Sequence, residues 1–452
     1  MSTKIGFVSL GCPKNLVDSE VMLGLLAQSG KEITTSQEDA EVIVVNTCGF
    51  IESAKQESID TILEMAQLKI TGSCRKLIVA GCLVERYRKE LMEQIPEIDA
   101  VIGTNEIPDI LKVCGEAPQN GSVPQYQSRE MYLYTDSDPR VLTTPGYGAY
   151  VKIAEGCDHP CSFCVIPKMR GPFRSRPMDS ILREATRLAK QGIKELNLIG
   201  QDTTMYGWDL GNRRGLAELI RSLGEVEGIE WVRLLYVYPN NVYGKLLEAI
   251  AQTPSACKYI DIPLQHASRR VLKSMKRGGN RSSLSRLIER IRRGIPEVAI
   301  RTTMIVGFPG EREEDVDELM GFVEEMRFDR LGVFTYSDEE DCAAYPLDEK
   351  VPEDVKKDRQ KRLMELQAGI SGEKNRQMIG KCLPVLLEGL SKESDLLWEG
   401  RLSTQAPDID GVVYLNDGVS EQTRPGDIVP VRITEAHEYD LVGALQCLVS
   451  SV

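Results

Sequence analysis

Strands and helices alternate along most of this 452-residue chain, and this alternation constrains the fold more than any other feature. Near the N-terminus, apolar runs that end at a cysteine predict strands at residues 4–12, 41–49 and 76–82. Helices are expected between them, one with Asp18 or Ser19 as its N-cap and one over residues 51–68. Because right-handed crossovers join such units, the alternation predicts a parallel sheet in an α/β domain.

The three expected strands end at Cys12, Cys48 and Cys82, each beside a glycine. Carboxyl ends of neighbouring parallel strands meet at one edge of the sheet, where α/β proteins bind ligands. Glycine leaves room there for a bulky group. A single free cysteine is most often an ordinary buried residue, but three at one edge predict a metal cluster. Cys74 and Cys114 lack this context and are expected to be structural.

Three further cysteines lie within one short loop at CxxxCxxC spacing, namely Cys157, Cys161 and Cys164. Such a loop can place three thiolates around a four-iron cluster and leave the fourth iron open for another ligand. Zinc, with His159 as the fourth ligand, is the competing interpretation, and spacing alone leaves it open. A disulfide is disfavoured, because three is an odd number and the chain has a cytosolic character.

The alternation restarts near Tyr150 with about six strand–helix units, which predicts a parallel barrel or partial barrel. The CxxxCxxC loop follows the first of these strands, so it is expected at the carboxyl face, where such barrels hold their active sites. The expected strands are 149–155, 195–200, 231–238, 259–264, 299–306 and 330–336.

Polar residues cluster where these strands end, and they are candidates for holding a polar cofactor. Each is equally plausible as a cap or loop residue with no ligand. The candidates are Asn197, Gln201, Asp202, Tyr236, Gln265, Thr303 and the 307–310 turn.

Composition divides the chain into four segments: a domain at 1–115, a linker at 116–142, a domain at 143–375 and a domain at 376–452. A long charged helix is expected at 351–377. Short strands separated by turn signals follow it, which predicts a small antiparallel β-barrel. The expected barrel strands are 382–390, 396–402, 411–415, 428–437 and 441–449.

Charge is unevenly distributed along the chain, whose net charge is −13. From residue 375 to the end, six Lys/Arg face twelve Asp/Glu, a difference of −6. An acidic barrel repels phosphate and attracts a basic protein, although the same charge can serve solubility alone. By contrast, the stretch from Arg269 to Arg293 has ten Lys/Arg and one Glu, a local +9. A solvated helix face is the favoured interpretation, and an RNA contact is the alternative.

The sequence opens without a secretory signal, and no apolar run approaches the roughly 18 residues of a membrane span. We therefore expect a protein of the reducing cytoplasm, away from membranes. In that compartment, cysteines are metal ligands or catalytic groups more often than disulfides.

Taken together, these motifs resemble the radical S-adenosylmethionine (SAM) enzymes, and among them the methylthiotransferases. The CxxxCxxC loop with Phe163 before its last cysteine opens the central domain, as in the radical SAM enzymes. A three-cysteine α/β domain before it and a small barrel of the TRAM type after it are typical of the methylthiotransferases. The motifs that carry the resemblance are residues 9–20, 46–50, 155–164, 170–176, 200–204, 261–266 and 306–310.

The resemblance implies two 4Fe-4S clusters, one held by Cys12, Cys48 and Cys82 and one by Cys157, Cys161 and Cys164. It also implies that SAM is both radical source and methyl donor. SAM would bind the open iron of the second cluster near Phe163 and the rim residues, and the first cluster would present sulfur to the substrate in a shared cavity. An electron donor such as flavodoxin or ferredoxin is implied as well.

Within this family, the Cys-Pro-Lys-Asn opening at residues 12–15, Asp-His-Pro at 158–160 and the acidic barrel favour one branch. That branch modifies the Cβ of an aspartate in ribosomal protein S-12. The alternative branch modifies isopentenyladenosine in tRNA, and the basic stretch keeps that alternative open. A zinc-stabilised, non-enzymatic scaffold that binds RNA or protein is the alternative from another class.

Overall fold

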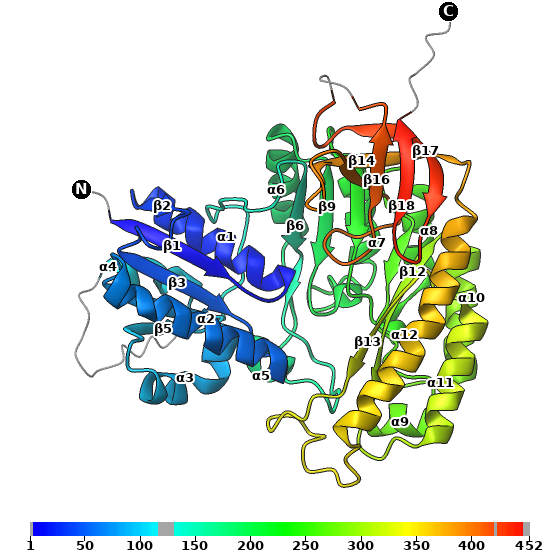
Figure 1. Ribbon diagram of the computed structural model, residues 1–452, viewed down its shortest axis with the longest axis horizontal. Helices are drawn as coiled ribbons and strands as arrows, with labels where there is room; N and C mark the ends of the chain where they lie inside the picture. Colours follow the sequence, from blue (N-terminus) through cyan, green and yellow to red (C-terminus); the bar gives the residue numbers. More distant parts are fainter. Residues whose placement is uncertain (1–2, 116–130, 420–422, 446–452) are drawn as a thin grey trace, which may run out of the picture.

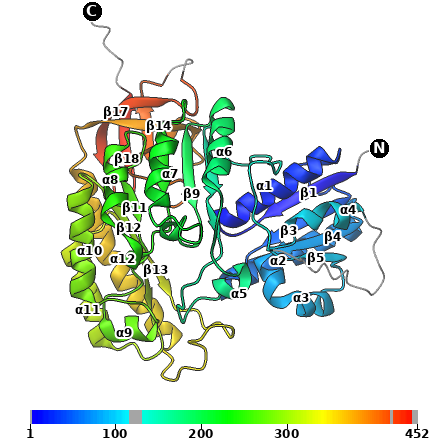
Figure 2. The same cartoon turned by 180° about the vertical axis from the view of Figure 1, so that it is seen from behind.

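The computed structural model describes residues 3–115, 131–419 and 423–445, and it confirms the predicted α/β fold class. An N-terminal parallel sheet lies beside a central α/β domain, and a small closed barrel lies at one end of the central domain (Figures 1 and 2). Of the predicted linker at 116–142, residues 116–130 lie outside the described residues. No helix in the described part of the chain is long and apolar enough to cross a membrane.

The N-terminal domain has five parallel strands in the order β2-β1-β3-β4-β5. Every residue of the two strands β3 and β4 is buried, as expected for strands covered on both faces. Helices α1 and α4 pack on one face, and α2 and α3 pack on the other. The elements are β1 Lys4–Ser9, α1 Pro13–Gln28, β2 Glu32–Thr34, β3 Val42–Thr47, α2 Glu52–Thr71, β4 Lys76–Gly81, α3 Cys82–Gln94, β5 Ala100–Ile102, η1 Ile107–Asp109 and α4 Ile110–Gly115.

The first helix begins earlier than predicted. Its N-cap is Cys12 and its first residue is Pro13, whose missing N–H costs nothing at that position. The prediction of Asp18 or Ser19 as N-cap was wrong, because both residues lie inside the helix and are buried. Their polar side chains are used in buried contacts with other elements, which apolar periodicity does not reveal.

The central domain consists of two three-stranded parallel sheets, in the orders β6-β9-β10 and β11-β12-β13. A parallel bridge between Val232 and Ala256 joins them, so that the six strands form a partial barrel, as predicted. Strands β10 and β11 end sooner than expected, and the residues that follow include Tyr236 and Gln265 with φ of 60° and 74°, outside strand geometry. The strands are β6 Gly148–Lys152, β9 Glu195–Ile199, β10 Trp231–Leu234, β11 Tyr259–Asp261, β12 Ala299–Val306 and β13 Arg330–Thr335.

Helices cover the outside of these strands, and their apolar faces form the largest core of the protein. A short two-stranded ribbon and helix α5 lie near the N-terminal domain (Figure 1). The remaining elements are β7 Ala154–Glu155, α5 Ile166–Arg170, β8 Arg174–Ser175, α6 Met178–Lys190, η2 Thr203–Met205, α7 Gly215–Gly224, η3 Pro239–Asn241, α8 Gly244–Gln252, α9 Arg269–Ser274, α10 Arg281–Gly294, α11 Glu313–Met326 and α12 Glu353–Arg376.

The C-terminal barrel is closed, with the strand order β14-β15-β16-β18-β17. Its pairs are antiparallel except β16 with β18, which is parallel. A fully antiparallel barrel was expected, but an odd number of strands cannot close with every neighbour reversed. The strands are β14 Cys382–Leu390, β15 Trp398–Leu402, β16 Val413–Asp417, β17 Ile428–Ala436 and β18 Leu441–Leu445.

Buried ion pairs fix the barrel on the central domain. Arg401 of β15 donates to Glu195 of β9 at 2.6 Å, and Arg233 of β10 donates to the other oxygen of Glu195 at 2.9 Å. The phenol of Tyr259 donates to Asp410 at 2.7 Å and that of Tyr150 donates to Asp408 at 3.1 Å. The barrel is therefore held in one orientation by paired, desolvated charges.

Candidate active site between two cysteine triads

The first cysteine triad, Cys12, Cys48 and Cys82, lies at the carboxyl edge of the N-terminal sheet, as predicted. Cys12 caps α1, Cys48 follows β3 directly and Cys82 is the first residue of α3. Gly11 has φ +87°, and a side chain there would lie 2.8 Å from Cβ of Cys48. The glycine therefore permits the close approach of two of the three cysteine loops.

The thiols of the first triad differ in their ionisation. Burial opposes ionisation of Cys12, but the nearby Lys14 and Arg170 lower the pKa of its thiol below the ordinary value. Burial raises the pKa of Cys48, and it raises that of Cys82 to about 12. A metal must therefore displace protons from two buried thiols, as is usual when iron binds cysteine.

The second triad lies in the loop between β7 and α5. Gly156 precedes it with φ +83°, and a side chain there would lie 2.0 Å from the carbonyl oxygen of Pro172. The N–H of Cys157 donates to the Gly171 carbonyl at 3.0 Å. Burial raises the pKa of Cys157 to about 11 and raises that of Cys164 further. Arg277 directs its guanidinium at Cys161, 3.7 Å from the sulfur, where it would stabilise a thiolate.

His159, the alternative zinc ligand, is engaged by its neighbours. Its Nε2 lies 2.6 Å from a carboxylate oxygen of Asp202, and its ring stacks on Tyr238 at 3.6 Å between centroids. Arg277 covers the Tyr238 ring at 4.3 Å from its centroid. Among the described residues, no three His, Cys, Asp or Glu side chains are grouped closely enough to hold a single metal ion.

The predicted cofactor residues Asn197, Gln201 and Gln265 share an unusual property. Within the part of the chain that the structure describes, each has a buried amide oxygen with no hydrogen-bond partner. Buried acceptors of this kind are normally satisfied, and a ligand with an ammonium group and hydroxyls would satisfy them. These residues therefore fit SAM, whose methionine and ribose parts carry such donors.

The other predicted cofactor residues have mixed surroundings. The N–H of Gln265 donates to the Thr303 carbonyl at 2.8 Å, and Tyr236 donates its N–H to Asp261 at 3.0 Å. These bonds hold both left-handed residues in place at the rim. Phe163 packs against a small apolar cluster that includes Phe308 and Tyr336. A SAM contact by Phe163, Thr303 or Tyr236 stays a prediction.

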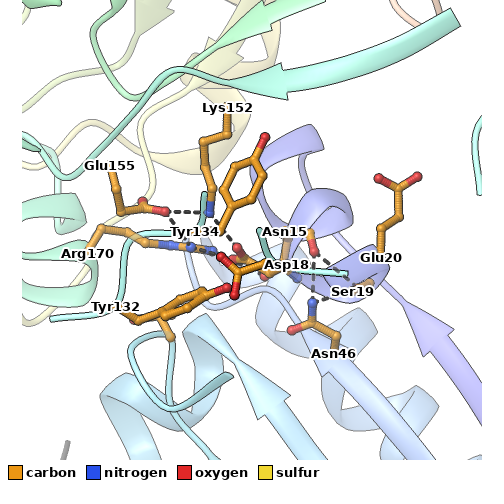
Figure 3. Close-up of polar contacts among 12 residues, drawn as sticks. Asn15, Asp18, Ser19, Glu20, Asn46, Tyr132, Tyr134, Lys152, Glu155 and Arg170 are labelled. Carbon is orange, nitrogen blue, oxygen red and sulfur yellow. Dashed lines mark hydrogen bonds and ion pairs between the residues drawn. The ribbon is translucent and has the colours of Figure 1, made fainter. Parts of the chain in front are cut away.

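A buried network of charged residues joins the two domains, and the sequence reasoning missed its role (Figure 3). Lys152 of β6 pairs with Asp18 of α1 at 2.5 Å and with Glu155 at 2.6 Å. Arg170 of α5 pairs with the second oxygen of Asp18 at 2.6 Å. One signal of this network was present in the sequence, namely a lysine within the apolar strand 148–152. Because a lysine is seldom buried unless it is paired, Lys152 there indicates a buried anionic partner.

This network reaches both candidate sites. Arg170 donates to the Cys82 sulfur at 3.3 Å and lies 3.5 Å from Glu155. The Gln201 amide donates to the other oxygen of Glu155 at 2.6 Å. Polar contacts thus run from the first triad to Gln201, and Cys82 packs in one cluster with Val165, the residue after Cys164.

Ion pairs of Arg140 and Glu339 also hold the two domains together. Arg140 pairs with Glu20 of α1 at 2.5 Å and with Glu184 of α6 at 2.9 Å. In the loop after β13, Glu339 pairs with Arg86 of α3 at 2.8 Å and with Lys55 of α2 at 3.0 Å. Paired charges on several sides therefore fix the domains relative to each other.

The basic stretch from Arg269 to Arg293 is largely used within the fold. Arg281 pairs with Glu325 at 2.7 Å and Arg270 pairs with Asp315. Arg290 and Arg292 donate to backbone carbonyls of neighbouring elements, at 2.9 Å and 2.6 Å. These contacts favour a structural helix face over an RNA site.

Three known families match successive parts of the chain. The descriptions that match are "Uncharacterized protein family UPF0004" at residues 4–103, "Radical SAM superfamily" at 151–323 and "TRAM domain" at 379–445. The structure of the radical SAM methyltransferase TsrM from Kitasatospora setae, with cobalamin and a [4Fe-4S] cluster bound, has a TM-score of 0.56 at 15% identity. It covers 76% of this chain and 77% of that chain, which shows a shared fold.

The fold and the CxxxCxxC loop thus define a radical SAM enzyme. The ribosomal protein uS12 methylthiotransferase RimO of Solibacter usitatus is 57% identical over 444 residues, which cover 98% of this chain and 94% of that protein. RimO of Koribacter versatilis is 52% identical, covering 98% of this chain and 96% of that protein. The chain therefore belongs to the RimO family of methylthiotransferases.

Proposed function

We propose that this protein adds a methylthio group to Cβ of an aspartate in ribosomal protein S-12, using two 4Fe-4S clusters and SAM. One observation of the structure supports this proposal independently of family membership. Cys82 of the first triad packs in one cluster with Val165, which follows Cys164, and Arg170 connects Cys82 to Glu155, two residues before Cys157. Two sites that must act on the same carbon need this proximity.

The residues have separate roles in this scheme. Cys157, Cys161 and Cys164 would hold the cluster that binds SAM, and Cys12, Cys48 and Cys82 would hold the second cluster. When bound, these groups supply a radical strong enough to take hydrogen from an unactivated carbon, and the sulfur that replaces it. The protein's own contribution is to bind and orient SAM and the substrate and to exclude water.

Several residues perform that contribution. The unpaired amide oxygens of Asn197, Gln201 and Gln265 would accept hydrogen bonds from SAM. Arg170 orients Cys82 from across the domain boundary. Every charge in the Lys152 network is paired, so no unpaired ion is left at the domain boundary. The network can therefore keep bulk water out of this boundary.

The barrel offers a place for a basic protein substrate. Part of its negative charge is used against the central domain, because Glu388, Asp408 and Asp410 bond residues at that interface. At the end of the barrel formed by the β14–β15 loop and the end of β16, Glu393, Asp395 and Asp417 are exposed. Opposite charge there would steer a basic ribosomal protein.

An electron donor and a cellular compartment complete the proposal. An electron donor such as flavodoxin or ferredoxin would reduce the clusters, and the reaction would take place in the cytoplasm, where ribosomes are modified. tRNA modification is the competing activity, and the internal use of the basic stretch makes it the weaker candidate.

The test offers purified S-12 protein and unmodified tRNA together to the anaerobically reconstituted enzyme. Mass spectrometry is expected to find the methylthio group on the aspartate of the protein alone. Modification of the tRNA instead would overturn the substrate assignment. The same preparation is expected to hold about eight irons per chain and to be brown, whereas a colourless zinc protein would overturn the two-cluster scheme.

A further inference from the structure

Lys14 is a buried cation whose neighbours are the Tyr236 ring and the Cys12 thiol, whose pKa it lowers. It lies in the first turn of α1 and is 8% exposed. Its ammonium group lies 3.3 Å from the centroid of the Tyr236 ring. Within the ranges that the structure describes, no carboxylate pairs with Lys14, although buried lysines elsewhere in this chain are paired, such as Lys152.

Nearby carboxylates are not available to Lys14, because each is already bound. Asp18 is shared by Lys152 and Arg170. Asp261, beside Tyr236, accepts from Arg301 at 2.8 Å and from the Tyr236 N–H at 3.0 Å. The fold thus engages both of these carboxylates and leaves Lys14 beside the Tyr236 ring and the Cys12 thiol.

A desolvated ammonium group is costly unless an anion pairs with it. A cation–π contact recovers only part of the lost hydration. Because neither nearby carboxylate of the fold is available to Lys14, we expect it to pair with a carboxylate that arrives with a ligand.

The position of Lys14 indicates which ligand this is. It follows Cys12 of the first triad by two residues and reaches across the domain boundary to Tyr236 at the cofactor rim. A substrate carbon that reacts with both sites must pass through this region. In an aspartate side chain, the carboxylate is bonded directly to Cβ, so an anchored carboxylate fixes the reacting carbon.

We propose that Lys14 binds the side-chain carboxylate of the substrate aspartate, and thereby selects aspartate over residues and bases without that charge. The proposal rests on the protein-substrate function proposed above. It makes Lys14 a specificity-determining residue, because asparagine or a nucleobase would leave the buried ammonium unpaired. The competing role for Lys14 is to balance the negative charge of thiolates at the first triad.

Binding measurements on the reconstituted holoenzyme separate these roles. The ligands are purified S-12 protein and the same protein with its target aspartate replaced by asparagine. The wild-type enzyme is expected to bind the asparagine form about 10- to 100-fold more weakly, the range for a charged hydrogen bond. In Lys14→Met, the two forms are expected to bind with similar affinity, while iron content and the visible spectrum stay those of the wild type.

Matched variants make each outcome decisive. Lys55→Met also removes a lysine at the domain boundary, but one that pairs with Glu52 and Glu339, and it is expected to keep the discrimination. Lys14→Arg retains the charge, and this variant is expected to keep most of the discrimination between the aspartate and asparagine forms. If Lys14→Met fails to fold, Lys14→Gln replaces it in the comparison.

Two results would overturn the proposal. One is a Lys14→Met or Lys14→Gln enzyme that still prefers aspartate by the wild-type factor. The other is a loss of iron in that variant together with unchanged discrimination by its loaded fraction, which would assign Lys14 to the cluster. Failure of the parent function is distinct, because the wild-type enzyme would then modify tRNA and leave the S-12 protein unmodified.

Discussion

Arg170 donates a hydrogen bond to the sulfur of Cys82 at 3.3 Å, and the two residues belong to different domains. The same guanidinium pairs with Asp18 of the N-terminal domain and approaches Glu155 of its own domain. Groups that contact the ligands of a metal orient those ligands and tune the metal. We therefore infer that the geometry of the first triad depends on how the two domains are docked.

Replacement of Arg170 by Met is expected to affect the first cluster more than the second. The change removes the contact with Cys82 and leaves Lys152 as the only cation paired with Asp18 and Glu155, which costs about 3 kcal/mol of stability. SAM cleavage should survive in part, whereas methylthio transfer should fall at least about tenfold, in the range seen for groups that support metal ligands. Iron analysis and electron paramagnetic resonance of the reduced protein measure the outcome.

Arg140→Met is the matched control for that variant. Arg140 is equally buried and also bridges the domains, through Glu20 and Glu184, but among the described residues it contacts no cysteine. It is expected to lose similar stability and to keep the wild-type iron content and spectrum. Equal spectral changes in both variants would contradict a specific role for Arg170.

The two triads are expected to be separable by mutation. Cys157→Ala should abolish SAM cleavage, because it removes a ligand from the cluster that binds SAM. Cys48→Ala should spare some SAM cleavage and abolish methylthio transfer. Product analysis for 5′-deoxyadenosine and for the modified protein measures both steps, with Cys74→Ala as the control for a buried cysteine outside the triads. Wild-type transfer by Cys48→Ala would contradict the two-cluster scheme.

The sequence was most informative where one residue type repeats in one structural context. Cys12, Cys48 and Cys82 could be placed at one sheet edge because each follows an apolar run and neighbours a glycine. The candidate cofactor residues were predicted in the same way, from the ends of strands, although Asn197 lies in the middle of β9 and Thr303 in the middle of β12. Asn197, Gln201 and Gln265 then proved to share unpaired amide oxygens, a property that depends on three-dimensional packing.

Contacts between domains could not be predicted, because their partners are distant in sequence. Lys152 and Asp18 are separated by 134 positions, and Arg401 and Glu195 by 206. The start of α1 was also missed, since its first turn carries polar residues for the site in place of apolar ones for the core. The acidic barrel was recognised from composition, but only the structure shows which charges are used internally.

The Glu195–Arg401 pair predicts a pH-dependent stability. Burial alone would raise the pKa of Glu195, but Arg401 and Arg233 lower it to about 2. A carboxyl with a depressed pKa stabilises the fold fully above its unfolded value of about 4.3. That contribution is lost as the pH falls to the folded value, because over this range the unfolded chain binds a proton that the folded carboxyl does not.

Glu195→Gln should therefore lower the free energy of unfolding by about 3 kcal/mol at neutral pH, since it leaves the buried Arg233 without an anion and Arg401 with Glu388 alone. The difference from the wild type should shrink between pH 4.5 and pH 2. Denaturant unfolding across this range measures it, and Glu248→Gln, a surface carboxylate, is the control. A difference that does not vary with pH would contradict the assignment.

The exposed acidic end of the barrel predicts a defect in substrate binding that leaves the chemistry intact. Glu393, Asp395 and Asp417 form no ion pair among the described residues, so their replacement by Lys should not disturb the fold. The triple variant should raise KM for the S-12 protein about tenfold or more and leave kcat within about twofold. Exposed charges at the edge of an interface change the rate at which the two proteins associate and not the chemical step. The wild-type KM should rise with salt, and the variant should lose this dependence. Steady-state kinetics at several salt concentrations measure both effects. Glu289→Lys, on the basic stretch remote in sequence from the barrel, tests a charge reversal away from the barrel, and an equal rise in KM for that variant would contradict docking at the barrel.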